Sequence, residues 1–257
     1  MSNRSRRFNY KHFIRRAHRY LGVFIGIQFI LWTLGGLYFS WTDLNEIHGD
    51  HLRARQHVEM SIPAGSISPD QIVQTVQSKI GVTRIEKIYI VEVLGEYFYA
   101  VEHVNDEKPS TVLVSVKDGS VRTEVSSAEA GRIAQQALAT PSEPAELTYL
   151  TADNVSKHHE YREKPLPAWA VTLGNNVSVY VAAETGQVGA VRTDNWRAFD
   201  FLWMLHTMDF KGRDNINNYV LRGFSVLGLI TVLSGFSLFF VSSRFFRRLS
   251  SKRASGR

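Results

Sequence analysis

Two long uncharged stretches constrain this chain more than any other feature of its sequence. The first runs from residue 20 to 41 and the second from residue 223 to 241, with residues 219–222 able to extend the second outward. About 20 apolar residues in a helix are enough to cross the ~30 Å hydrocarbon core of a bilayer. The sequence therefore predicts two transmembrane helices, over residues 20–41 and 219–242.

The charge distribution predicts how these helices are oriented. Residues 1–19 hold seven Lys or Arg and residues 243–257 hold six, and neither segment contains an acidic residue. With these 13 removed from the total of 30, the 17 remaining basic residues are outnumbered by 24 acidic ones. Basic tails outside both apolar stretches predict cytoplasmic termini in a bacterial inner membrane, with residues 42–218 exported. Because the basic excess is confined to these tails, it indicates topology and not nucleic-acid binding.

Two further features narrow the class of protein. The chain has no cysteine, which excludes disulfides, iron–sulfur clusters, thiolate catalysis and cysteine-ligated zinc. A cleaved signal peptide is the rival interpretation of the first apolar stretch. That stretch is longer than the usual core of ~7–15 residues, and the following LYFSWTD has no small-x-small cleavage pattern. We predict an uncleaved anchor.

The exported region begins with a helix followed by strands. Residues 68–80 have apolar side chains at helical spacing after a Ser-Pro-Asp start, which predicts an amphipathic helix. Residues 84–104 form two alternating β-rich runs joined at Leu94-Gly95-Glu96. Residues 110–125 continue the pattern, with a turn at Asp118-Gly119. The pattern predicts one helix packed on an antiparallel sheet.

The same pattern then recurs, which indicates an internal repeat. A second amphipathic helix is predicted at residues 126–138, and strands are predicted in AELTYLTA, PAWAVTLG and NVSVYVAAETGQVGAVRTD. The phrases VSVKDGSV and VYVAAETGQV align, so that Gly119 and Gly186 take matching positions. Neither unit contains a Gly-rich phosphate loop or a Ser/His/Asp catalytic arrangement. The predicted fold class is an α+β membrane protein with two transmembrane helices flanking a tandem domain.

Histidines lie at both predicted membrane faces. His18 precedes the first span at its cytoplasmic mouth, and His206 lies in an amphipathic interfacial segment at residues 195–218. Ionisable groups at such positions are often functional, so both are candidate ligands. The alternative for His18 is an interfacial polar residue.

A second histidine group follows the first span. His48 and His51 are three residues apart, and a continuing helix would put them on one face. With Asp50 they make a candidate metal site of nitrogen and oxygen ligands, which Asp43 and Glu46 could complete. A helix end at Gly49 and a polar collar at the membrane surface are the alternatives, and both stay open.

A third candidate lies in the charged segment 154–167, between predicted strands of the second unit. His158 and His159 stand beside Glu160, a combination that is able to hold a metal. A solvated loop explains these charges without a ligand, and we favour that interpretation.

Several motifs together resemble the PepSY-associated transmembrane proteins. They are HRYLG before the first span, WTDLNEIHGDH after it, DGSV and ETGQV in the two units, and LHTMDF before the second span. The resemblance covers nearly the whole chain and implies PepSY-like exported units. Larger, four-helix relatives are ferric-siderophore reductases that carry b-type haem on membrane histidines. The resemblance therefore implies haem b as a cofactor, with His18 and His206 at matching positions.

The chain departs from those relatives because it has two spans and not four. A bis-histidine haem needs two imidazoles on opposite sides of one ring. On the cytoplasmic side His18 would need its counterpart from a second subunit, which predicts a homodimer. On the exported side His48 or His51 would pair with His206. The tails are too short for a flavin or nicotinamide domain, so electrons would come from quinol or another membrane redox protein.

Two functions follow from these patterns. One is haem-linked transmembrane electron transfer to a ferric chelate, as a reductase or an accessory of one. The other is a non-enzymatic, membrane-tethered module that binds or regulates a peptidase or a membrane protein. The bilayer is a partner in both.

The predicted organisation is a basic arm (1–19), first span (20–41), juxtamembrane collar (42–65), first unit (66–125), second unit (126–194), interfacial segment (195–218), second span (219–242) and basic tail (243–257).

Overall fold

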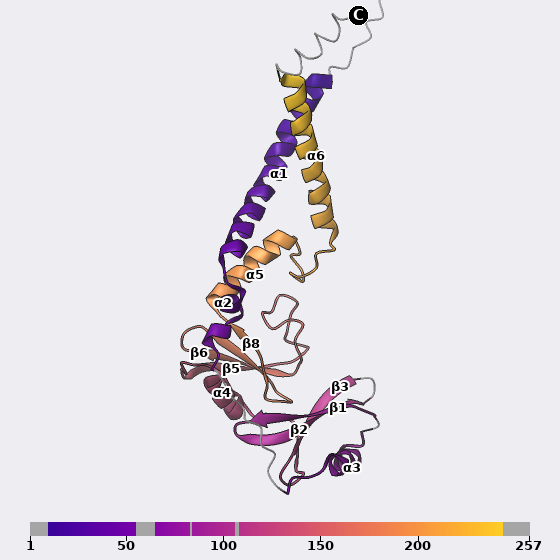
Figure 1. Cartoon of the computed structure of the whole chain (residues 1–257), viewed down its shortest axis with the longest axis vertical. Coiled ribbons are helices and arrows are strands. Elements are labelled where there is room, and N and C mark those ends of the chain that lie inside the picture. Colours follow the sequence, from indigo (N-terminus) through magenta and orange to yellow (C-terminus); the bar gives the residue numbers. More distant parts are fainter. Residues whose placement is uncertain (1–9, 55–64, 83, 106–107, 244–257) are drawn as a thin grey trace, which may run out of the picture. The chain divides into compact units, whose positions relative to one another are not determined.

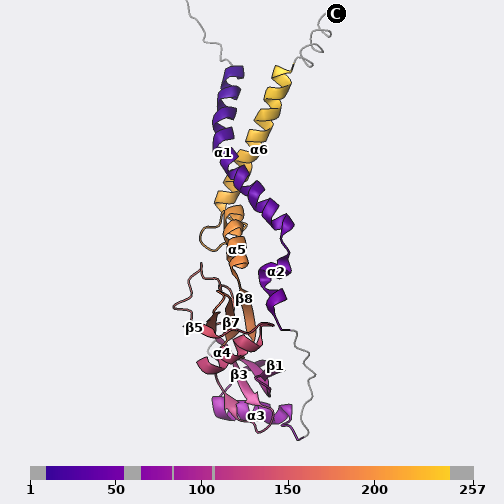
Figure 2. The same cartoon turned by 90° about the vertical axis from the view of Figure 1, so that its left-hand side faces the viewer.

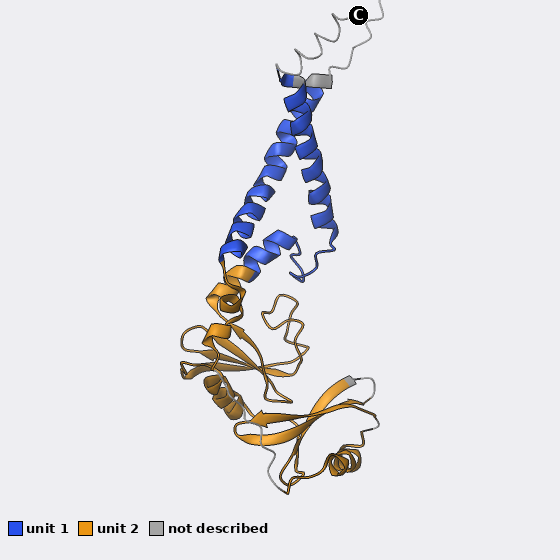
Figure 3. Cartoon of the chain, in the orientation of Figure 1, with its two compact units in different colours: residues 1–41, 200–257 blue, residues 42–199 orange. Residues whose placement is uncertain are grey.

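The computed structural model describes residues 10–54, 65–82, 84–105 and 108–243. Two compact units make up the chain: residues 1–41 with 200–257, and residues 42–199 (Figure 3). Residues 1–9 of the predicted basic arm and 244–257 of the predicted basic tail lie outside the described residues. The fold is α+β with antiparallel sheets, as predicted.

The first unit contains two helices that are long and apolar enough to cross a membrane. They are α1, Tyr10–Trp41, and α6, Tyr219–Ser242 (Figure 1). Both predicted spans are therefore helical, and α1 extends outward from the first span through residues 10–19 of the basic arm. Asn218 caps α6, with its side-chain oxygen accepting the Leu221 N–H at 2.8 Å.

Two glycines of α6 shape its contact with α1. A Cβ atom on Gly228 would lie 3.1 Å from the ring of Phe29, and one on Gly235 would lie 3.2 Å from the imidazole of His18. Small residues at these positions let the helices approach closely. A Cβ on Gly22 or Gly26 of α1 would meet no atom within 4 Å. The GxxxG pair of α1 thus takes no part in this contact.

Helix α5, Asp194–Thr207, spans the border between the units, and its residues from Asp200 onward belong to the first. Gln28 and Trp32 of α1 donate hydrogen bonds to the carbonyls of Leu205 and His206, at 3.3 and 3.0 Å. These carbonyls have no partner within the helix, so polar side chains of α1 satisfy them. The helix ends at Thr207 and does not continue through the predicted interfacial segment.

The second unit contains a short collar and two helix-and-sheet assemblies (Figures 1 and 2). The collar is α2, Leu44–His48, and a single 3-10 turn, η1, Asp50–Leu52. The first assembly is α3, Pro69–Ile80, with β1, Arg84–Val93, β2, Glu96–Asn105, β3, Lys108–Ser115, and β4, Val121–Arg122. The second assembly is α4, Ser127–Gln136, with β5, Pro144–Leu150, β6, Ala168–Leu173, β7, Ser178–Ala182, and β8, Val188–Arg192.

Both assemblies have the same topology, an antiparallel sheet whose strands are neighbours in sequence order. Each helix begins with a capping box, formed by Ser68 with Gln71 in α3 and by Ser126 with Glu129 in α4. The turns before β4 and β8 contain Gly119 and Gly186, both at a φ of +70°. These two glycines take matching positions when the two repeats of the sequence are aligned with each other.

The assemblies share one core. Helix α3 covers one face of its sheet through Ile72 and Val76. The other face of that sheet packs with α4 and the second sheet in a single apolar cluster, which includes Val93, Ile133 and Val181. Glu184, in the turn after β7, also accepts hydrogen bonds from Ser110 Oγ at 2.7 Å and Thr111 N–H at 2.9 Å. These contacts hold the two sheets together.

Candidate functional site

His18 lies deeper between the helices than its predicted place at the mouth of the span. Its Nδ1 is 2.7 Å from Ser234 Oγ, and Gly235 leaves room for the ring. Ser234 is eight residues from the end of α6 at Ser242, which is about 12 Å of helix. Ring-to-hydroxyl contacts of this kind join helices in membranes.

His206 lies in an aromatic cluster at the end of α5. Its ring is stacked on Trp203 at 6.2 Å and lies within 6.1 Å of Trp32 and 5.8 Å of Phe39. Nδ1 of His206 is buried and has no hydrogen-bond partner among the described residues. A pocket of about 330 Å³ adjoins the cluster, and its other lining residues include Thr207, Ile216 and Leu221.

The first unit does not bring His18 and His206 together. His18 contacts α6, whereas His206 lies beside Trp32, and 14 residues of α1 separate these points by about 21 Å. A bis-histidine haem needs its two ligands at one depth. The described residues of this unit therefore do not supply both ligands of such a haem, and the second ligand would be His48 or His51 of the other unit or a residue of a second chain.

The predicted collar site has exposed histidines. Helix α2 ends at His48 because Gly49, at a φ of +74°, forms its C-cap. The continuing helix that would align His48 and His51 is therefore absent, and His51 lies in η1. Asp50 forms an ion pair with Arg53 at 3.3 Å. Within the described ranges, no group of three His, Cys, Asp or Glu is arranged to hold a metal, and the ligand roles of His48, Asp50 and His51 stay predictions.

Segment 151–167 is a loop, as favoured, but it is not a simple solvated tip. Tyr161 is fully buried and stacks on Tyr180 of β7, with ring centroids 4.7 Å apart. Its hydroxyl donates to the carbonyl of Pro165 at 3.0 Å. The loop thus covers the face of the second sheet opposite α4, where Leu150 and Ala190 complete a small core.

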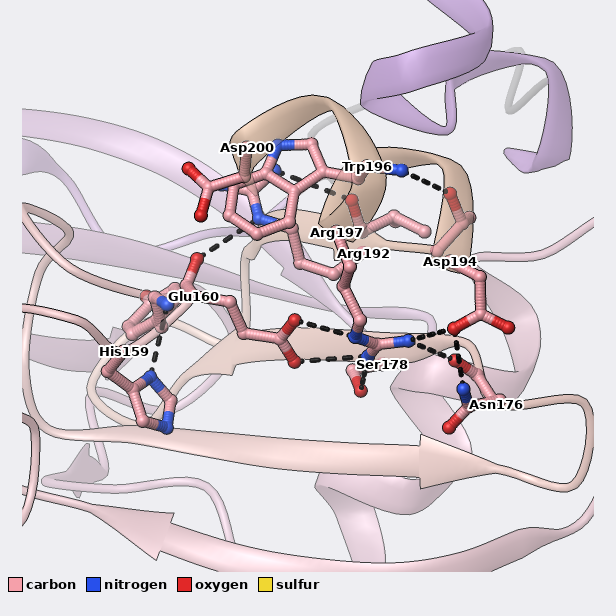
Figure 4. A network of polar contacts seen from close by, with 12 residues as sticks. His159, Glu160, Asn176, Ser178, Arg192, Asp194, Trp196, Arg197 and Asp200 are labelled. Carbon is pink, nitrogen blue, oxygen red and sulfur yellow. Dashed lines mark hydrogen bonds and ion pairs between the residues drawn. The ribbon is translucent and has the colours of Figure 1, made fainter. Parts of the chain in front are cut away.

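Glu160 fixes this loop to the sheet and to α5 (Figure 4). Its carboxylate accepts two hydrogen bonds from Arg197, at 2.9 and 3.1 Å, and one from the Tyr180 hydroxyl at 2.7 Å. Arg197 also donates to Ser178 Oγ and to Asp194. Burial, followed by the hydrogen bond to Glu160, raises the pKa of Tyr180. The carboxylate is engaged by its neighbours, which indicates a structural role.

A groove of about 490 Å³ lies beside β1 in the second unit. Its lining includes Val91, Glu92, Leu94, Ile133, Gln136 and Val188. They come from the last part of β1 and its hairpin turn, the end of α4 and the start of β8. Sequence patterns do not reveal this groove, because a groove between two assemblies depends on how they dock. Its local signal was the alternating run IYIVEV, which carries only one charge.

Residues 66–125 match a family model described as peptidase propeptide and YPEB domain, the PepSY domain. These residues coincide with the first predicted unit and contain β1. No curated protein and no solved structure matches the chain. The match confirms a PepSY domain in this chain and suggests a regulatory or binding module; such domains are often extracytoplasmic. The relationship to ferric-siderophore reductases stays a prediction.

Proposed function

We propose that this protein is a membrane-anchored PepSY module that binds a partner protein and regulates it. The observation that carries the proposal is the groove, because it is bordered by β1 of the matched PepSY domain. Concave surfaces that combine apolar and polar groups are common sites of recognition. The family description names peptidase propeptides, so a peptidase is the first partner to test.

The two apolar helices support the anchoring part of the proposal. Both termini lie on the cytoplasmic side of a bacterial inner membrane, and residues 42–218 are exported. The basic residues that precede the first helix and follow the second support this orientation. An alkaline-phosphatase fusion after Arg257 should be inactive and one at Asp153 should be active. The reverse pattern would contradict this topology.

Haem-linked electron transfer to a ferric chelate is the second candidate function. The aromatic surroundings of His206 and its unpartnered Nδ1 favour it. His206 would hold haem b at the exported end opposite His48 or His51, and His18 would hold it at the other end opposite a ligand from a second subunit. The protein would then be a redox subunit, and its electrons would come from quinol or a membrane redox partner.

An absorption spectrum of the detergent-purified protein, oxidised and then reduced with dithionite, separates the two functions. We expect no haem bands, even after reconstitution with haem. Near-stoichiometric haem that is lost in His206→Ala or His18→Ala would overturn the binding proposal.

Photo-crosslinking in cells tests partner binding directly. A photoreactive amino acid in place of Gln136, in the groove, should give a discrete adduct. The matched control replaces Asp153, which is exposed in the loop of the second assembly, and should give none. Equal labelling at both positions would contradict recognition through the groove.

A further inference from the structure

Sheet edges expose backbone groups that pair readily with other chains, and proteins usually cover or interrupt them. Three edges of the two described sheets carry such a device. Next to β4, Glu184 accepts the N–H of Thr111 on β3. Strand β5 begins with Pro144 and has an irregular register between Pro144 and Glu146. Beside β8 lies the collar, where a Cβ on Gly49 would be 3.0 Å from Val191.

The fourth edge, that of β1, is protected over only half of its length. Its first residues are charged, with Arg84 paired to Glu86, and the register shifts between Ile85 and Lys87. From Ile88 to Val93 the register is unbroken, and no described strand pairs with the outer side. Glu92 is the single charged residue of this half.

The turn after β1 fixes which backbone groups point outward. Leu94 and Gly95 form a two-residue turn at φ values of 53° and 86°, and Val93 pairs with Glu96. Residues that flank such a turn exchange both hydrogen bonds, and the pattern then alternates along the strand. Val93, Val91 and Tyr89 therefore bond to β2, whereas the N–H and C=O groups of Glu92, Ile90 and Ile88 point to the open edge.

This open edge borders the groove. Ile90, Val91, Glu92 and Val93 all line it, so a strand added to β1 would have a concave surface of apolar and polar groups beside it. Leu94 also lines the groove and has a positive φ, which is strained for a side chain of this type. Glu92 and Glu96 are exposed at this end of the hairpin and carry two negative charges, whereas Arg53, which also lines the groove, is paired with Asp50 at 3.3 Å.

We propose that the open edge of β1, from Ile88 to Val93, binds an extended segment of the partner protein as an added strand. The segment pairs with the backbone of Ile90 and Glu92, places alternate apolar side chains in the groove, and carries a Lys or Arg beside Glu92 and Glu96. This mode of recognition gives affinity through the main chain and selectivity through alternate side chains. It rests on the proposed function and specifies how that module recognises its partner.

The test is selection of random eight-residue peptides by the full-length protein in lipid nanodiscs. We expect peptides that alternate apolar residues and include Lys or Arg. Their affinity for Glu92→Pro should fall at least about tenfold, because proline removes an outward N–H without removing a bond to β2. Glu92→Gln keeps that N–H and should weaken the basic peptides by no more than about fivefold, as expected for an exposed charge pair.

A second probe leaves the protein unchanged. Each selected peptide is resynthesised with N-methyl groups on alternate residues, in both registers. One register should lose binding and the other should keep it, because only one edge of the peptide faces β1. Equal loss or equal retention in both registers would overturn strand addition.

The remaining outcomes separate this inference from the proposed function. Selected peptides that bind wild-type and Glu92→Pro equally would overturn the β1 assignment and leave the module a binding protein. A dimer that Glu92→Pro converts to a monomer would assign the edge to a second copy of the chain. Peptide binding that appears only when residues 57–62 are replaced by Gly and Ser would indicate that the chain's own segment competes for the β1 edge. If no peptide is enriched although Gln136 gives its photo-adduct, strand addition is wrong and partner binding stands.

Discussion

The two helix-and-sheet assemblies have the same topology but differ in how much of each sheet is covered by other parts of the chain. In the second, a long loop packs Tyr161 on the sheet, and Glu160 ties that loop to Arg197. In the first, β1 follows α3 after a short link, and no described strand pairs with half of its outer edge. The comparison teaches that a loop covers one repeat and stabilises it, whereas the other retains the exposed edge that we propose for recognition.

The largest expected effect tests how far the loop stabilises the second assembly. Tyr161→Ala removes a fully buried ring and should cost about 3–5 kcal/mol of unfolding free energy. Hydrogen exchange should accelerate in β6–β8 more than in α3. Tyr161→Phe loses only the hydroxyl bond to Pro165 and should cost about 1 kcal/mol. Equal acceleration in both assemblies would show that they unfold together.

An intermediate effect compares one ion pair from each assembly. Glu160→Gln breaks a partly buried, doubly hydrogen-bonded pair with Arg197 and should cost about 1.5–3 kcal/mol. Glu102→Gln in β2 removes an exposed partner that lies 4.0 Å from Lys87 and should cost about 0–1 kcal/mol. Urea unfolding of the two variants measures the difference. Similar losses would contradict the structural role assigned to the Glu160 network.

The smallest expected effect concerns the two matching turns. The backbone N–H of Ser120, and then its hydroxyl, lower the pKa of Asp118 from 3.8 to about 2. The charged carboxylate therefore stabilises this turn above pH 4, and that contribution disappears as the pH falls through 2. The corresponding turn uses the hydroxyl of Thr185, which does not titrate in this range, to accept the N–H of Gln187.

Amide exchange distinguishes these turns. The protection factor of Ser120 should decrease between pH 5 and pH 2, whereas that of Gln187 should stay constant. Asp118→Asn should abolish the pH dependence at Ser120. A parallel decrease at Gln187 would indicate general acid unfolding.

Local patterns predicted most of the elements. Alternation in RIEKIYIVEV and EYFYAVEHV gave β1 and β2, and the serines before α3 and α4 marked both helix starts, since each forms a capping box. The match of Gly119 with Gly186 is reflected in their shared positive φ. Such features are set by neighbours in sequence, so sequence reasoning finds them.

The sites were harder to predict because they depend on distant contacts. Glu160 and Arg197 are 37 residues apart, and nothing in either local sequence indicates their pairing. From the sequence, His18 is a residue at the mouth of a span. Its position between the helices depends on the space that Gly235 of α6 leaves for its ring, and Gly235 is distant in sequence. Tyr161 lies in a segment rich in charge, where a buried ring is unexpected. The ligand roles of His18, His48, His51 and His206 stay predictions.

The contact of Glu184 with β3 bears on where this protein can be cut. The family model ends at residue 125, but Ser110 and Thr111 inside the matched region depend on a carboxylate beyond that border. A fragment that stops at the border would expose the β3 edge and the inner face around Phe98 and Leu113. Exposed edges and apolar faces promote aggregation. The segment that matches the domain family is therefore shorter than the segment that can be excised or grafted as a stable folded domain.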